Sequence, residues 1–367
     1  MKLLALIEGH GHVCYRYRLE AFAGALAEAG WSIEAAPLAR GTLRRGRQLR
    51  AAAEADVVVL QRKLLPLWQL GILRRAAKRL VYDFDDAVYC RDSYHKKGPT
   101  SWSRLMRFWA TLYVADAVIA GNEHLESQAG GYVDAKRVIR IPTCVDPSRY
   151  PTAAHQPGGG ARLVWIGQQS TMPSLQLAEA SLAAAARHVP ELELRVICDA
   201  APRLRGVRVA PRRWSQATEA AEIADADIGI SWLPDDPWSE GKCGLKVLQY
   251  MAAGLPVVAN PLGMNRELIE HGESGFLAST PEEWAEAIAR LAGDRNLRRA
   301  MGSAGRGIVE NHYSVDRWSG PFARLIDRLP HAGGRAGIHA TIAAIESVPI
   351  APQASQPQPS PARRTAA

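Results

Sequence analysis

The sequence has no run of consecutive apolar residues long enough to span a bilayer, which excludes a typical transmembrane helix. Its five cysteines, at positions 14, 90, 144, 198 and 243, include no CxxC pair. This spacing excludes a zinc ribbon and predicts buried, reduced thiols in place of a disulfide framework. The short apolar run at 3–7 ends at Glu8, before the apolar region of a signal sequence could form. We therefore expect a first strand there and a cytoplasmic protein.

Acidic residues are scarce between positions 40 and 79, where eleven Lys and Arg residues accompany only two acids. The formal charge of the whole chain is +8, so the remainder of the chain is close to neutral. Such a basic block indicates an anionic partner, and the lack of interleaved aromatic residues or a recognised reading module argues against nucleic acid. The cluster of Arg44, Arg45 and Arg47 is compatible with peripheral contact with the inner membrane face. A solvated helix face is the alternative.

Short apolar runs alternate with helical patterns, which is typical of parallel sheets covered by helices on both faces. The 367 residues are enough for two such domains. Strands are expected at 2–7, 31–36, 56–61, 79–84, 116–120, 138–141, 163–166, 193–198, 207–210, 228–232 and 256–259. Helices are expected at 18–29, 43–54, 67–77, 102–115, 124–130, 174–188, 216–224, 245–253, 281–291 and 297–312. We predict an α/β fold with two Rossmann-like, doubly wound domains facing a cleft.

Proline and glycine mark the boundary between the two halves. Three prolines and then the run Pro-Gly-Gly-Gly lie between 142 and 160. These residues interrupt both helix and strand, so we assign a first domain to 1–150, a flexible linker to 151–160 and a second domain to 161–330. The last helix of the second domain could pack back on the first. The composition of 331–367, rich in Ala, Gly, Gln, Ser and Pro, predicts a disordered tail.

The segment from Asp235 to Ala259 carries the strongest chemical signal in the sequence. It follows a predicted strand, and a helix is expected to begin near Gly244. Free N–H groups at a helix start bind anions, and Lys242 and Lys246 place two positive charges beside that start. The segment therefore predicts a phosphate site.

The same segment resembles the donor-site motif of the GT-B glycosyltransferases of family 4, also called group 1. Gly244-Leu245 and the runs at 251–254 and 256–259 match that motif in register. The resemblance extends over roughly 1–328 and is strongest over 226–313. It implies a retaining enzyme that moves a sugar from a UDP- or GDP-linked donor to an acceptor hydroxyl of a glycan, a lipid-linked sugar or a small molecule. It further implies polysaccharide biosynthesis, with no metal or other cofactor.

Two departures from the family pattern affect the expected chemistry. The two acidic residues of the family fall here on Gly241 and Gln249, with Glu240 one position out of register. The Arg and Lys that the resemblance places on the diphosphate are replaced by Gln168 and its three successors. We expect Lys242 and Lys246 to stabilise the leaving diphosphate instead. A nucleotide-sugar epimerase on the same fold and a non-catalytic nucleotide-sugar sensor are the alternatives.

The donor is expected to lie where the second domain's strands end. The predicted donor-binding residues are Gly167, Ser170, Thr171, Asp199, Trp214, Gly244, Leu245 and Gln249. Trp214 offers an indole for stacking on the base, and a place in the core is the equal alternative.

In the first domain, candidate residues follow the first and fourth strands. Asp85 follows the strand at 79–84, where the resemblance places a sugar-facing histidine, and we expect it to act in catalysis. Asp83 and Asp85 also form a DxD pattern, for which metal ligation or a solvated cluster are the alternatives. Gly11, Arg16 and Arg18 are expected in a loop that contacts an acceptor or a phosphate, with a solvated helix face as the alternative for the arginines.

Overall fold

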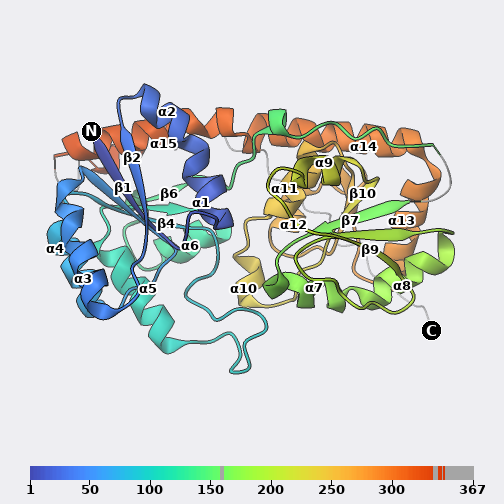
Figure 1. Cartoon of the computed structure of the whole chain (residues 1–367), viewed down its shortest axis with the longest axis horizontal. Helices are drawn as coiled ribbons and strands as arrows, with labels where there is room; N and C mark the ends of the chain where they lie inside the picture. Colours follow the sequence, from blue (N-terminus) through green and yellow to red (C-terminus); the bar gives the residue numbers. More distant parts are fainter. Residues whose placement is uncertain (158–160, 334–337, 341, 344–367) are drawn as a thin grey trace, which may run out of the picture.

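Two parallel β-sheets, each with six strands among the residues described, form the cores of two domains that lie side by side (Figure 1). The computed structural model describes residues 1–157, 161–333, 338–340 and 342–343. Both sheets carry helices on their two faces. The predicted α/β class with two doubly wound domains is confirmed.

The first sheet has the strand order β2-β1-β3-β4-β5-β6. Its strands are β1 (Lys2–Ile7), β2 (Ser32–Pro37), β3 (Val57–Gln61), β4 (Leu80–Phe84), β5 (Ala117–Ala120) and β6 (Val138–Arg140). All residues of β3, β4 and β5 are buried, because helices cover both faces of the sheet. Each of the six predicted strands is found within one residue of its expected bounds.

Helices cover the two faces of the first sheet. They are α1 (Val13–Arg18), α2 (Ala23–Glu28), α3 (Thr42–Ala51), α4 (Leu67–Ala76), α5 (Trp102–Val114) and α6 (Glu123–Gly130). Buried side chains of α3 to α6 form one apolar cluster, whereas α2 contributes Leu26 to the cluster on the opposite face. The single helix predicted at 18–29 is wrong in its bounds. The chain leaves the helical conformation at Leu19, which separates α1 from α2.

The second sheet has the order β12-β11-β10-β7-β8-β9. Its strands are β7 (Arg162–Ile166), β8 (Glu193–Ile197), β9 (Arg208–Arg212), β10 (Ile228–Ser231), β11 (Val257–Ala259) and β12 (Gly275–Leu277). The sequence analysis missed β12, a three-residue edge strand that is too short to show a period. The helices are α7 (Met172–Leu177), α8 (Glu179–His188), α9 (Glu219–Ala224), α10 (Pro237–Glu240), α11 (Leu245–Ala252), α12 (Met264–Leu268), α13 (Pro281–Gly293), α14 (Arg295–Ile308) and α15 (Val315–Arg328).

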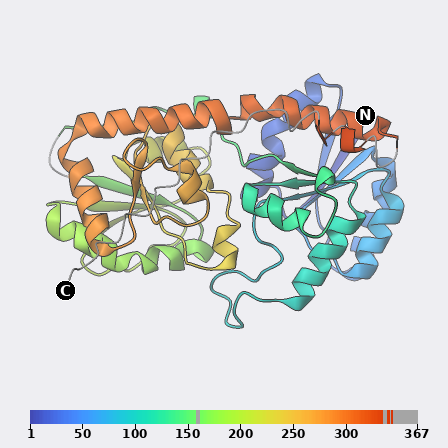
Figure 2. The same cartoon turned by 180° about the vertical axis from the view of Figure 1, so that it is seen from behind.

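Helices α14 and α15 run along the same side of the molecule and connect the two domains (Figure 2). Helix α15 packs on the first domain, where Phe322 stacks on Phe22 with ring centroids 4.8 Å apart. The sequence analysis did not expect α15, because Pro321 normally interrupts a helix. The apolar face of α15, including Trp318 and Ile326, is buried against the first sheet and stabilises the helix.

The structure constrains the predicted linker and tail. Residues 158–160 of the linker lie outside the described residues, but the preceding part is held on the second domain. The N–H of Ala153 donates to the carbonyl of Ala253 at 2.9 Å, and His155 Nε2 lies 2.9 Å from the carbonyl of Gly254. Most of the predicted disordered tail is likewise outside the described residues. Its described part includes Ile338 and Ile342, which are buried in the first domain's core, so packed chain extends beyond residue 331.

Candidate active site

The loops at the carboxyl ends of the two sheets meet between the domains. Asn122, which follows β5, donates from Nδ2 to the carbonyls of Gly241 and Lys242, each at 3.2 Å. A Cβ on Gly241 would lie only 2.7 Å from the backbone N of Ala87, so the close approach requires glycine. The position at which the family carries an acid is thus a backbone contact between domains in this chain.

The second domain presents two lysines at the start of α11. Gly244 adopts a left-handed conformation with φ of 65° and caps the helix, and Lys246 lies in the first turn. Lys246 Nζ lies 4.5 Å from the centroid of the Trp165 ring, and Lys242 Nζ lies 6.0 Å from that of Trp238. In the described part of the chain no carboxylate lies within ion-pair distance of either ammonium. We call Lys242 and Lys246 the lysine pair.

Burial and the neighbouring charge of Lys242 lower the pKa of Lys246 to about 7. An ammonium in this state is readily neutral at physiological pH unless an anion restores its charge. The N–H groups of the first helical turn precede the intrahelical hydrogen bonds and are oriented toward the same end of α11. The start of α11 therefore combines first-turn N–H groups with two ammonium groups, an arrangement that favours a bound anion.

The loop after β7 lies beside this helix start. A Cβ on Gly167 would lie 2.3 Å from the Trp165 ring, which also contacts Lys246. Thr171 Oγ1 accepts a hydrogen bond from the N–H of Gln168 at 3.1 Å and donates to the carbonyl of the same residue at 2.9 Å. Ser170 is exposed in this loop. The Trp165 ring thus lies between the predicted donor-binding loop at Gly167 and Lys246 of the lysine pair.

Two of the other predicted donor residues, and Gly11 of the predicted acceptor or phosphate loop, have different surroundings. Asp199 is exposed after β8. Leu245, at the first position of α11, packs at the edge of the apolar cluster. Gly11 is exposed at the start of the loop before α1. None of the three has a side-chain hydrogen bond or ion pair within the described part of the chain.

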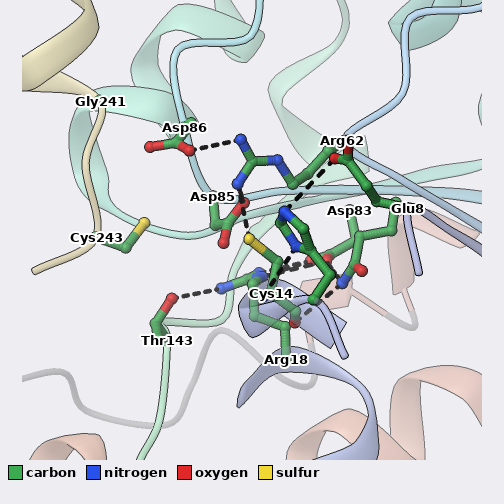
Figure 3. A network of polar contacts seen from close by, with 12 residues as sticks. Glu8, Cys14, Arg18, Arg62, Asp83, Asp85, Asp86, Thr143, Gly241 and Cys243 are labelled. Carbon is green, nitrogen blue, oxygen red and sulfur yellow. Dashed lines mark hydrogen bonds and ion pairs between the residues drawn. The ribbon is translucent and has the colours of Figure 1, made fainter. Parts of the chain in front are cut away.

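A second charged group follows strands β3 and β4 of the first domain (Figure 3). Arg62 Nη1 lies 3.2 Å from Asp85 Oδ1, and its Nη2 lies 2.6 Å from Asp86 Oδ2. We call these three residues the strand-end network. Arg62 has a φ of 57°, which is strained for an arginine and persists only where the surroundings impose it. The sequence analysis missed Arg62 and Asp86, although a cation directly after a buried strand was a usable signal.

The two carboxylates of the strand-end network differ in their ionisation. Burial would raise the pKa of Asp85, but the charges of Arg62 and Arg18 outweigh it and hold this pKa below its ordinary value. Burial raises the pKa of Asp86 despite the opposing charges of Arg62 and Lys242. Asp85 is the more buried of the two, and Asp86 lies on the side of Gly241 (Figure 3). Asp86 is therefore the better placed carboxylate to meet a ligand from the second domain.

Arg18 and Asp83 form a buried ion pair with each other. Arg18 donates to Asp83 with a closest distance of 2.6 Å and to the carbonyl of Ile141 at 3.1 Å, and Gln61 also donates to Asp83. Both charged side chains are buried. This corrects one prediction, since Arg18 does not face an acceptor phosphate. For Asp83, metal ligation was only an alternative, and both of its carboxylate oxygens accept hydrogen bonds from protein side chains. No group of three or more potential metal ligands is present among the residues described.

A buried network of polar side chains joins the two domains, and we call it the interdomain network. It consists of Arg16, Tyr17, Tyr150, Glu219 and Gln249. The Arg16 guanidinium forms an ion pair with Glu219 from the other domain. The Tyr17 hydroxyl donates to Glu219 at 3.0 Å and lies 3.1 Å from the Tyr150 hydroxyl, and Gln249 Nε2 donates to Tyr17 at 3.0 Å.

The interdomain network corrects three further predictions. Arg16 is paired and buried, so it is not an exposed acceptor contact. Gln249 donates to two tyrosines in place of the expected contact with the donor. Trp214 Nε1 donates to Glu219 at 2.8 Å, and the Arg16 guanidinium lies 5.8 Å from the centroid of the indole. The Trp214 ring thus already has a protein partner where a base was expected to stack.

Residues 151–294 match the family model described as glycosyl transferases group 1. The D-inositol 3-phosphate glycosyltransferase of Thermobispora bispora is 30% identical over 209 residues, which is 51% of this chain and 46% of that protein. The GDP-Man:Man(3)GlcNAc(2)-PP-Dol alpha-1,2-mannosyltransferase of Dictyostelium discoideum is 30% identical over 108 residues, 29% of this chain and 20% of that protein. The chain thus spans less than half the length of these curated relatives.

Solved structures share the fold. Sucrose-phosphate synthase from Thermosynechococcus elongatus superposes with a TM-score of 0.72 at 18% identity, covering 91% of this chain and 100% of that one. HepE from Anabaena, in complex with UDP and glucose, superposes with a TM-score of 0.64 at 17% identity, covering 88% and 98%. At these identities the superpositions show the two-domain fold.

Proposed function

We propose that this chain, a group 1 glycosyltransferase with the GT-B fold, moves a sugar from a nucleoside-diphosphate sugar to an acceptor hydroxyl. The observation that carries the proposal is the lysine pair at the start of α11, which has no carboxylate partner in the described residues and includes an ammonium with a pKa of about 7. Such a site gains most from a ligand that brings concentrated negative charge. A diphosphate has that property.

The second domain would hold the nucleotide and its diphosphate. The first-turn N–H groups of α11 and the ammonium of Lys246 would bind the phosphate oxygens, and Lys242 would approach from the preceding loop. HepE is solved with UDP and with UDP-glucose, and some curated relatives are named as GDP-mannose-dependent. These names favour a UDP- or GDP-linked donor.

Catalysis would depend on charge stabilisation. Negative charge on the leaving diphosphate grows as the bond to the sugar breaks, and the lysine pair would stabilise it without a metal ion. Asp86 would accept a hydrogen bond from the transferred sugar or from the acceptor, held in place by Arg62. We propose that the reaction retains the configuration at the anomeric carbon. The first domain would bind the acceptor, which would be a glycan, a lipid-linked sugar or a small molecule.

A thermal-shift screen of UDP, GDP and their sugars tests the donor. A ligand at a hundredfold its dissociation constant should stabilise the protein by about 2.7 kcal/mol. Turnover with the stabilising donor should release free nucleotide only when an acceptor is added. A changed sugar without nucleotide release would indicate an epimerase, and binding without any chemistry would indicate a sensor. Either result would overturn the proposed transfer.

A further inference from the structure

Helix α5 exposes large apolar side chains along one face. Trp102 is 73% exposed, Met106 38%, Trp109 42% and Tyr113 58%. At about 100° per residue these four positions fall within roughly 60° of one another around the helix. The rings of Trp109 and Tyr113 lie side by side, with centroids 6.0 Å apart. We call these four residues the aromatic stripe.

The aromatic stripe is not part of the folded core. The opposite face of α5 supplies Phe108 and Leu112, which are fully buried against the first sheet. Helix α5 is therefore apolar on two faces, and the described residues bury only one of them. Soluble proteins seldom expose a contiguous apolar patch of this kind without a partner for it.

The surroundings of the aromatic stripe are positively charged. Helices α3, α4 and α5 lie next to one another on the same face of the first sheet, and their sequences contain eight arginines and no acidic residue. Arg107 is exposed on α5 itself. The neighbouring α4 begins with two more exposed apolar side chains, Leu67 and Trp68.

We propose that the aromatic stripe is a membrane-contact surface that lies on an anionic bilayer. Trp and Tyr rings favour the boundary between headgroups and acyl chains, because one end of each ring is apolar and the other is polar. Arginines near that boundary attract anionic lipid headgroups. A protein partner would account for the apolar face. Three neighbouring helices with eight arginines, of which Arg74 is paired with Asp116, and with no acidic residue of their own match the uniform negative charge of a bilayer better.

The aromatic stripe relocates the contact expected from the sequence. Helix α3 carries Arg44, Arg45 and Arg47, but its exposed apolar surface is limited to Leu43, since Gly46 and Leu49 are buried. Helix α3 can add charge, whereas α5 supplies the apolar area that inserts.

Helix α5 follows a loop that reaches the second domain. Figures 1 and 2 show α5 along the lower side of the first domain, where it follows the long loop that comes after β4. Ser93 in that loop lies 3.3 Å, hydroxyl to hydroxyl, from Ser239 of the second domain. Contact through Trp102 would therefore bring this loop, and its contact with the second domain, close to the lipid surface. The inference goes beyond the proposed reaction, and its test does not require turnover.

Cosedimentation with vesicles tests the proposal on the full chain. The wild-type protein should bind vesicles of equal parts phosphatidylglycerol and phosphatidylcholine more tightly than pure phosphatidylcholine. Replacing both Trp102 and Trp109 with serine should weaken binding to the anionic vesicles at least about tenfold. Arg107→Gln should weaken it about fivefold and leave phosphatidylcholine binding unchanged. Leu177→Ser, at an equally exposed apolar residue on α7 of the second domain, is the matched control and should change nothing.

Quenching by lipids brominated in their acyl chains provides a second measurement on the wild-type protein. Tryptophan fluorescence should fall on vesicle binding, and the double serine variant, with an unchanged melting temperature, should lose most of this quenching. Equal vesicle binding of wild type and double variant would overturn the proposal, as would a wild-type protein that binds no anionic vesicles. A wild-type dimer that the double variant dissociates would also overturn it, because the stripe would then be an interface between copies.

Discussion

Helix α11 contributes to two polar regions that are built in opposite ways. In the interdomain network, the charges of Arg16 and Glu219 neutralise each other, and the Gln249 amide donates to two tyrosines. In the lysine pair, one helical turn away, no carboxylate of the described residues lies within ion-pair distance. Buried polar groups with protein partners hold a fold together, whereas buried charges without them require a ligand. The comparison separates the residues that join the domains from those that we propose to bind the donor.

The largest expected effect is on stability, in the interdomain network. Glu219→Ala should lower the free energy of unfolding by about 3–5 kcal/mol, because it leaves the buried Arg16 guanidinium without its counter-charge. Urea unfolding followed by circular dichroism measures the change. The matched control is Glu222→Ala on the same helix, whose carboxylate is more exposed and lies 3.5 Å from Arg195. That control should cost less than about 1 kcal/mol. Equal losses of unfolding free energy in the two variants would show that the interdomain network adds no more stability than an exposed ion pair.

The next effect is on turnover, in the lysine pair. Lys246→Ala should reduce kcat by roughly 10²- to 10³-fold, the usual loss for one preorganised charge-stabilising donor, and should leave stability unchanged or higher. Lys242→Ala should lose less, because Lys242 precedes the helix. Lys246→Arg keeps the positive charge and serves as the control. If a folded Lys246→Ala protein has wild-type kinetics, the diphosphate is held elsewhere.

A smaller effect concerns pH and has opposite signs for stability and for binding. The pKa of Lys246 is about 7 in the fold against an ordinary value of 10.5, so the unfolded chain holds more protons between these values. Stability of the ligand-free protein should therefore gain from this group as pH rises through that window. Affinity for UDP should fall over the same window, by at most about tenfold per pH unit, because the bound anion requires the charged ammonium.

Calorimetric titration with UDP from about pH 7 to about pH 9 measures the binding trend. Lys246→Arg should flatten the profile, because its guanidinium stays charged throughout. A wild-type profile as flat as that of the arginine variant would mean that Lys246 does not bind the nucleotide.

The smallest expected effect is that of chelation. EDTA should leave turnover unchanged, because the lysine pair would supply the charge that a metal supplies in other sites. Loss of activity with EDTA and its recovery with Mg²⁺ or Mn²⁺ would contradict this expectation. It would also transfer the main electrostatic role from the lysine pair to carboxylates such as Asp86.

Local signals account for the parts of the fold that the sequence predicted. The strands of the first sheet were found within one residue because their buried apolar runs are flanked by turn residues. Edge strand β12 and helix α15 were missed, the first for its length and the second for Pro321. In both cases packing against the rest of the molecule outweighs a weak or contrary local pattern.

The sequence predicted only those parts of the candidate site whose residues lie close together in the chain. Lys242, Gly244 and Lys246 lie close together in the chain, and their position at a helix start could be inferred from the sequence. Arg16 and Glu219 are separated by 203 positions, and no local pattern could show that one neutralises the other. The sequence analysis therefore predicted that Arg16 contacts an acceptor or a phosphate, whereas in the structure it pairs with the carboxylate of Glu219.

The sequence by itself determined the two α/β domains and the position of two lysines at the start of α11. These features depend on periodicity and on residues near one another in the chain. Only the tertiary structure decided which charges have partners, which of two adjacent carboxylates is less buried and which apolar helix face the described residues leave exposed. Partners and burial depend on contacts between distant segments, and those contacts set the pKa of Lys246, the pairing of Arg16 and the exposure of Trp102.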